Sequence, residues 1–254
     1  MEPQLPYGVT DGVATIVICQ PAKRNAMTDE MWRSLPPILD ELAVDPAVRA
    51  LVLTGAGGTF CAGADISTLS GPPGTVEAAQ ELSVRAEEAL AAFPKPTLAV
   101  VRGHCVGGGC QLAAACDLRF ADEDALFGVT PAKLGIIYPE SSTRRLVSLV
   151  GPATAKYLLF SGELIDAARA LRTGLVDEVW APDALDARVA EFTEILTARS
   201  QLTQAAAKDF SAGRSDRAEH WAALARGTGE TAEGVAAFLE HRPPRFPWPP
   251  QPVE

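Results

Sequence analysis

The alternation of strand-like and helical segments constrains the fold of this chain more than any other sequence feature. Alternating, β-branched residues predict strands at 14–20, 49–54 and 96–101, and helical periodicity predicts helices at 28–43 and 75–92. Repeated strand, helix and strand segments form a parallel or mixed sheet covered by helices, with binding loops at the carboxyl ends of the strands. We therefore predict an α/β fold.

The pattern changes near Gly151. A Gly-Pro-Ala turn there opens a stretch of predicted helices, interrupted by one short apolar segment at 175–180 and ending near Glu240. We divide the chain into a core over residues 1–190 and a helical C-terminal region with a Pro-rich tail over residues 191–254. The tail HRPPRFPWPPQPVE excludes a regular helix, and both extended wrapping over a neighbour and disorder fit its composition.

Composition excludes several function classes. The 254 residues, 47% hydrophobic and 21% charged, are enough for one sizeable core. A formal net charge of −10 disfavours nucleic acid and anionic membranes as partners. The apolar runs are shorter than the ~20 residues of a membrane helix, and the chain start lacks a signal-peptide pattern, so we expect a cytoplasmic protein. Five cysteines without a Cys-x-x-Cys pair predict reduced thiols and no metal site.

Two glycine-containing turns follow predicted strands, GGTFCAGADI at 57–66 and VGGGCQ at 106–111. Glycine allows positive φ and close approach of a ligand to the backbone, and peptide N–H groups at a helix start point outward. Two such turns could direct two N–H groups at one carbonyl oxygen, which is the design of an oxyanion hole. The alternative is that both turns are ordinary tight connections between strand and helix.

The segments FCAGADI and GHCVGGGCQLAAACDLRFA resemble the two signature stretches of the crotonase superfamily, the enoyl-CoA hydratase and isomerase family. Further similar segments lie before and after these two stretches, in the order of the family, among them PAKRNAM, FGVTPAKLGI and SGELIDAARALRTGLVDEV. The resemblance implies a crotonase-like spiral of ββα units whose helical C-terminal region trimerises, giving a homotrimer or a dimer of trimers. It also implies an acyl-CoA thioester as substrate or ligand, as in fatty acid metabolism, and no metal or redox cofactor.

The same resemblance assigns site residues. The backbone N–H groups of Ala64 and Gly108 match the oxyanion-hole donors of the family. The residues that match its CoA-binding positions are Lys23 and Arg24 for the phosphates, Ala62, Asp65 and Ile66 for the adenine, and Arg242 and Phe246 in the tail. A solvated surface is the alternative role for the basic residues.

The acid-base positions depart from the family pattern. Hydration of a 2-enoyl thioester needs an activated water and a proton donor, which the family supplies with two glutamates. This chain has Gln111 and Pro131 at the matching positions. An amide can orient water but cannot take its proton, and proline has no acid or base. The two-glutamate mechanism is therefore not expected here.

Candidate replacements lie in the loop LGIIYPESST, where some branches of the family carry an acidic or tyrosyl catalytic residue. Tyr138 and Glu140 are these candidates, and the alternative for Glu140 is a stabilising position at a helix N-terminus. We expect Lys133 to lie in solvent, His104 to be structural and Cys110 to be buried and unreactive.

Three functions remain open. The first is a hydratase- or isomerase-like lyase that stabilises a thioester enolate with rearranged acid-base residues. The second is a decarboxylase, because TPxxLGxxY at 130–138 is similar to methylmalonyl-CoA decarboxylases of the superfamily and loss of CO2 forms an enolate without a base. The third is a catalytically silent acyl-CoA binding protein.

Overall fold

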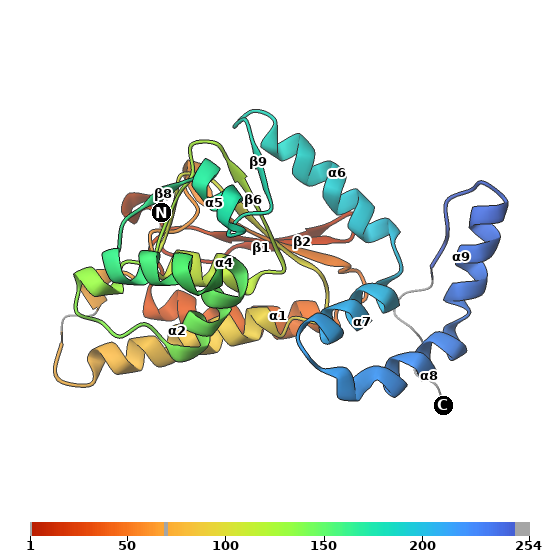
Figure 1. The fold of residues 1–254 in the computed structure, drawn as a ribbon, viewed down its shortest axis with the longest axis horizontal. Helices are drawn as coiled ribbons and strands as arrows, with labels where there is room; N and C mark the ends of the chain where they lie inside the picture. The colour runs from red at the N-terminus through yellow and green to blue at the C-terminus, as the bar shows by residue number, and fades with distance from the viewer. Residues whose placement is uncertain (1, 69–70, 247–254) are drawn as a thin grey trace.

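Two β-sheets organise the computed structural model, which describes residues 2–68 and 71–246 (Figure 1). The strands are β1 (Tyr7–Thr10), β2 (Val13–Ile18), β3 (Ala50–Gly55), β4 (Thr97–Val101), β5 (His104–Val106), β6 (Leu118–Asp122), β7 (Leu126–Gly128), β8 (Ile165–Asp166) and β9 (Glu178–Trp180). The larger sheet has the order β1-β2-β3-β4-β6-β9, parallel except for β1, and the smaller has the order β5-β7-β8.

Nine α-helices accompany these sheets in the described part of the chain. They are α1 (Asp29–Val44), α2 (Thr75–Ala91), α3 (Gly108–Ala115), α4 (Glu140–Ser161), α5 (Ala167–Thr173), α6 (Leu185–Ala198), α7 (Gln201–Ser211), α8 (Ala218–Thr228) and α9 (Glu230–Leu239). The predicted α/β class is therefore confirmed. Thr28 caps α1, because its hydroxyl accepts a hydrogen bond from the Met31 N–H at 3.3 Å.

The central strands β3 and β4 of the larger sheet are buried on both faces, to which successive side chains of a strand point in turn. Leu51 and Leu53 of β3 join a core that includes residues of α1 and α2, whereas Val52 between them joins a second core with α6. In Figure 1, α1 and α2 run along one face of this sheet and α6 along the other. Burial on both faces explains the near-continuous apolar runs of β3 and β4.

The short strands of the smaller sheet were not predicted from the sequence. Strands β5, β7 and β8 have two or three residues each, too few to show an alternation of their own, and they are specified by pairing with one another. The expected turn at Gly151 is a kink instead. Helix α4 continues through Gly151, whose φ of 72° interrupts the helical geometry before Pro152.

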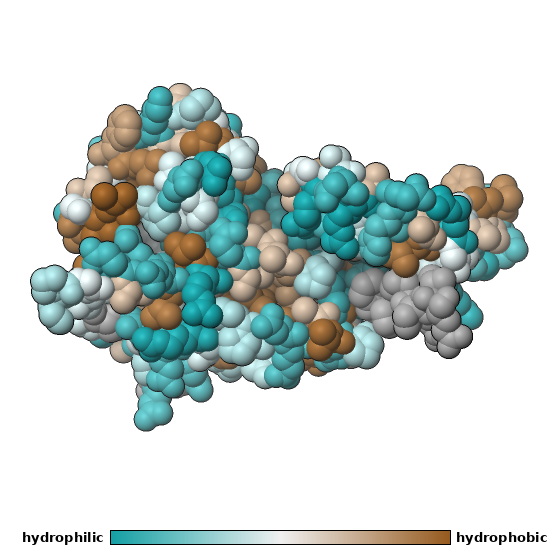
Figure 2. Space-filling view, turned by 90° about the horizontal axis from the view of Figure 1, so that it is seen from below, coloured by the Kyte–Doolittle hydropathy of each residue, from teal (hydrophilic) through white to brown (hydrophobic). Residues whose placement is uncertain are grey.

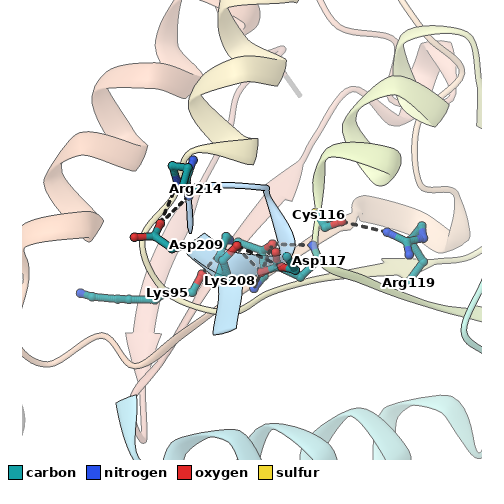
Figure 3. A network of polar contacts seen from close by, with 9 residues as sticks. Lys95, Cys116, Asp117, Arg119, Lys208, Asp209 and Arg214 are labelled. Carbon is teal, nitrogen blue, oxygen red and sulfur yellow. Dashed lines mark hydrogen bonds and ion pairs between the residues drawn. The ribbon is translucent and has the colours of Figure 1, made fainter. Parts of the chain in front are cut away.

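Helices α7, α8 and α9 extend from the sheets as an arm (Figure 1). The predicted boundary at residues 190 and 191 falls inside α6. Lys208 of α7 fastens the arm to the core, because its Nζ donates to Asp117 Oδ2 at 2.8 Å and to the Lys95 carbonyl at 3.1 Å (Figure 3). The next residue, Asp209, forms an ion pair with Arg214, in which Oδ1 lies 2.6 Å from the guanidinium nitrogen Nη2. This pair closes the turn between α7 and α8.

The outer end of the arm is apolar and uncovered in a single chain. Val235, Phe238 and Leu239 of α9 are 55%, 79% and 71% exposed, and Figure 2 shows hydrophobic side chains at that end of the molecule. Within the described residues, none of the helices combines the length and apolar character needed to cross a membrane. The end of the Pro-rich tail, residues 247–254, lies outside the described residues.

Candidate active site

The two glycine-containing turns lie against each other. Cys61 and Cys105 form an isolated parallel bridge, in which the Cys61 N–H donates to the His104 carbonyl at 2.8 Å and the Val106 N–H donates to the Cys61 carbonyl at 2.9 Å. Segments more than 40 residues apart are thereby held in fixed register. His104 joins this bridge through its backbone carbonyl.

Glycine is required where the two turns touch. Gly63 has a φ of 105°, and a Cβ atom built there would lie 3.0 Å from the Val106 carbonyl oxygen and 3.3 Å from the Gly108 nitrogen. A side chain on Gly109 would collide with the Cys61 carbonyl. Gly107 has a φ of 54° and a ψ of −117°, which an L-residue adopts only with strain. These glycines permit a backbone approach that any larger residue would prevent.

Two backbone N–H groups are left without acceptors at this junction. Within the described residues, Ala64 donates no backbone hydrogen bond, and Gly108 is the first residue of α3, where an N–H has no partner inside the helix. A Cβ atom built on Gly108 would lie 3.4 Å from the Ala64 nitrogen. The two donors predicted from the sequence are therefore neighbours, and both residues line one cavity.

This cavity holds about 750 Å³ of empty space, part of it open to solvent. Its lining is mostly apolar and includes four further residues from the sequence analysis, namely Ala62, Ile66, Gln111 and Tyr138. Pro131 lines it too. Among the described lining residues there is no carboxylate, imidazole or amine, and Tyr138 is the one titratable side chain. Partial burial raises the pKa of this phenol well above its ordinary value, which keeps it protonated near neutral pH.

On the side away from the cavity, Gln111 is hydrogen-bonded to Glu87, a residue that the sequence did not single out. Its Nε2 donates to Oε2 of Glu87 on α2 at 2.6 Å, and Ser142 Oγ donates to the same oxygen at 2.5 Å. Arg145 of α4 pairs with the other carboxylate oxygen. Burial raises the pKa of Glu87, although these three partners oppose the shift. An acidic residue four positions after Ser83 on the buried face of α2 was the available signal in the sequence.

Lys23 and Asp65, both expected at the CoA, bind each other. Lys23 Nζ lies 2.6 Å from Asp65 Oδ2 and 2.9 Å from Ser67 Oγ. Burial alone would raise the pKa of Asp65, but the hydrogen bonds from Lys23 and Ser67 outweigh it and the pKa is lowered. Arg24 adopts a left-handed conformation, and its side chain is exposed beside this pair.

Glu140 lies outside the cavity lining. It is the first residue of α4, its side chain is 82% exposed, and Oε1 is 3.6 Å from the Arg144 guanidinium. This is the helix N-terminal position that the sequence analysis kept as the alternative. Lys133 is exposed as expected.

The two tail residues lie against α9. Arg242 donates to both carboxylate oxygens of Glu233, at 2.7 and 2.9 Å, and the Phe246 ring is 3.6 Å from a Cβ atom built on Gly234. Hydrogen bonds from Arg242 and from the Arg245 N–H lower the pKa of Glu233 to about 2. Arg242 also donates to Glu240 Oε2 at 2.6 Å, just beyond the end of α9.

All five cysteines are buried, in agreement with the reduced thiols expected. Burial raises the pKa of Cys61 to about 12, so this thiol is not a nucleophile near neutral pH. Its Sγ accepts a hydrogen bond from the Gly63 N–H at 3.4 Å and supports the turn. Within residues 2–68 and 71–246, no group of three His, Cys, Asp or Glu side chains could hold a metal ion.

Two mixed sheets, two glycine-containing turns that meet at a cavity, and a C-terminal helical arm define the class of crotonase-fold proteins. The fold matches the crystal structure of an enoyl-CoA hydratase from Bacillus anthracis with a TM-score of 0.90 and 29% identity, over 95% of this chain and 98% of that one. The family model described as enoyl-CoA hydratase/isomerase matches residues 8–248. The chain belongs to this family.

Curated relatives support the assignment. A crotonyl-CoA hydratase from Syntrophomonas wolfei is 35% identical over 245 residues, which cover 92% of this chain and 94% of the relative. An (E)-benzylidenesuccinyl-CoA hydratase from Thauera aromatica is 34% identical over 253 residues, covering 94% of this chain and 96% of the relative. The resemblance inferred from the sequence motifs is thereby confirmed.

Proposed function

We propose that this protein binds an acyl-CoA thioester in the cavity and stabilises the enolate of its acyl group. The N–H groups of Ala64 and Gly108 would donate to the thioester oxygen as negative charge develops on it. Donors that are fixed before the reaction need no reorganisation, and losing one typically lowers the rate by about 10²–10³-fold. The observation that carries the proposal is the meeting of two N–H groups without acceptors at the wall of a mostly apolar cavity.

The most general reaction of this kind is hydratase- or isomerase-like, with acid-base groups rearranged from the usual two glutamates. Tyr138 lines the cavity and, being protonated, could deliver a proton but could not remove one from carbon. Gln111 could orient a water molecule. CoA itself would be held by Lys23, Arg24 and the cavity rim around Ala62, Asp65 and Ile66. No metal or redox cofactor enters this scheme.

Decarboxylation is the second candidate, and the lack of a carboxylate among the described lining residues favours it. In a malonyl-type thioester, the bond between the α-carbon and the free carboxylate breaks and CO2 leaves. The electron pair of that bond forms the enolate, which then takes a proton from Tyr138 or water. Charge stabilisation by Ala64 and Gly108 is sufficient for this step, because no base has to remove a proton from carbon.

The experiment is one binding and two turnover measurements on the purified protein. Calorimetry with butyryl-CoA measures binding, loss of enoyl absorbance with 2-enoyl-CoA measures hydration, and CO2 release from methylmalonyl-CoA measures decarboxylation. Binding with either turnover supports enolate stabilisation and identifies the reaction. Binding without turnover leaves the silent binding protein, and absence of binding contradicts the proposal as a whole.

The proposed assembly is a homotrimer or a dimer of trimers. The exposed apolar residues Val235, Phe238 and Leu239 of α9 support an interface at the end of the arm. Arg242 and Phe246, which lie beside α9, would then approach a CoA bound by a neighbouring subunit. Light scattering coupled to size-exclusion chromatography measures the mass of the assembly.

A further inference from the structure

Four polar side chains from three helices form a cluster behind the cavity wall. Glu87 of α2 is its centre and is fully buried, and its partners are Gln111 of α3 with Ser142 and Arg145 of α4. Of these four, Gln111 alone lines the cavity. The side-chain carboxamide of Gln111 is therefore the part of the cluster that contacts the cavity.

The partners of Glu87 decide which end of that carboxamide faces the cavity. Gln111 Nε2 at 2.6 Å and Ser142 Oγ at 2.5 Å share one carboxylate oxygen, and Arg145 donates to the other. Three donors around one carboxylate fit its ionised form, which offers acceptors alone. The NH2 group of Gln111 must then turn toward Glu87. Its carbonyl oxygen Oε1, which accepts no hydrogen bond from the described residues, is left for the cavity.

The position of this oxygen follows from the spacing on α3. Gln111 is three residues after Gly108, so both lie on the same face of the helix, about 4.5 Å apart along its axis. A ligand whose carbonyl oxygen meets the N–H of Gly108 would extend its acyl carbons past Gln111. A hydrogen-bond donor carried by one of those carbons would meet an acceptor that is already oriented.

We propose that Glu87 is a positioning residue that turns the Gln111 carbonyl oxygen into the cavity, so that the site selects acyl thioesters bearing a hydrogen-bond donor, such as a hydroxyl, near the thioester. This inference rests on the proposed thioester binding. It assigns Glu87 a role through Gln111 and not in contact with the ligand. Without the carboxylate, the amide could present either its donor or its acceptor to the cavity.

A purely structural role for the cluster would affect ligand binding differently from a positioning role. The pair of Glu87 and Arg145 joins α2 to α4, and its loss would lower stability whatever the ligand. Such a loss would weaken the binding of all thioesters alike. Only a positioning role changes the ratio of affinities between a hydroxylated thioester and its deoxy analogue.

The test is calorimetric titration with 3-hydroxybutyryl-CoA, each enantiomer separately, and with butyryl-CoA. We expect the wild-type protein to bind one hydroxylated enantiomer about fivefold more tightly than butyryl-CoA, the usual effect of one net hydrogen bond. Glu87→Gln should bring the ratio close to one, because a glutamine at this position can accept from or donate to the Gln111 amide. Glu88→Gln is the matched control, since Glu88 is half exposed, contacts Arg145 at 3.2 Å and does not touch Gln111. It should keep the wild-type ratio.

A second variant covers the case in which Glu87→Gln does not fold. Glu87→Asp keeps the charge beside Arg145 but withdraws the carboxylate from Gln111, and it should also reduce the ratio. Equal ratios in the wild type and in the folded Glu87 variants would overturn the inference, as would a wild type that binds all these thioesters equally. If the wild type bound none of them, the proposed function would fail together with the inference.

Discussion

Cys61 and Cys105 pair as a parallel bridge, and this contact fastens the two glycine-containing turns into one wall of the cavity. The turns approach so closely that the backbone nitrogen of Gly108 is 3.3 Å from the place where a Gly63 side chain would begin. The pairing brings two short motifs, each a weak signal by itself, together at one cavity.

Gly108→Ala tests the donor pair. The added Cβ would lie 3.0 Å from the Trp32 ring and 3.4 Å from the Ala64 nitrogen, so it would displace the donors and obstruct the ligand oxygen. We expect turnover of the accepted thioester to fall by about 10²–10³-fold. Gly8→Ala is the control, because nothing lies within 4 Å of its added Cβ. A folded Gly108→Ala protein with wild-type turnover would rule out the proposed role of this N–H.

Tyr138→Phe and Glu140→Gln separate the two acid-base candidates. Tyr138 lines the cavity, whereas the Glu140 side chain is 82% exposed and lies outside the lining. We expect Tyr138→Phe to lower turnover by about 10²-fold, in the range of a lost general acid, and Glu140→Gln to change it less than about twofold. Steady-state kinetics on both variants measure this. The reverse result would restore Glu140 as the catalytic group predicted from its loop.

Lys23→Met tests the ion pair at the cavity rim. Because the pKa of Asp65 is lowered in the folded protein, the pair stabilises the fold above the ordinary Asp pKa of 3.8, and the contribution is lost as the pH falls through the folded value. The variant should unfold with about 1 kcal/mol less stability near neutral pH, and the difference should shrink in acid. Urea unfolding at several pH values measures it. Arg24→Met, which alters an exposed neighbour, should show no such pH-dependent difference.

Glu233→Gln tests how the tail is attached. The pKa of Glu233 is lowered from 4.5 to about 2, so the attachment is complete above pH 4.5 and weakens as the pH falls toward 2. Near neutral pH, trypsin should cleave the variant after Arg245 several-fold faster, as followed by mass spectrometry, whereas the bond after Arg242 precedes Pro243 and resists trypsin. Glu240→Gln keeps both bonds between Arg242 and Glu233 and should give a smaller increase. Unchanged cleavage in Glu233→Gln would show that other contacts hold the tail.

The long elements were predictable because their patterns are local. Helix α1 could be placed from Thr28, Asp29 and Glu30, and β3 from a run of apolar residues, since capping and burial leave a mark in consecutive positions. Strands β5 and β8 leave no such mark, because each is stable only through its pairing with β7. The same limit hid Glu87, whose partners lie 24 to 58 residues away in the sequence.

By itself, the sequence determined the α/β class, the family and the two glycine turns, because these depend on residue types at fixed local spacing. The tertiary structure alone decided that Lys23 is paired with Asp65, that Glu140 lies outside the cavity lining and that Glu87 accepts a hydrogen bond from Gln111. The physical reason is that burial and hydrogen bonding are properties of neighbours in space. The residue type supplies a carboxylate, and the neighbours that folding places around it set its pKa and its hydrogen-bond partners.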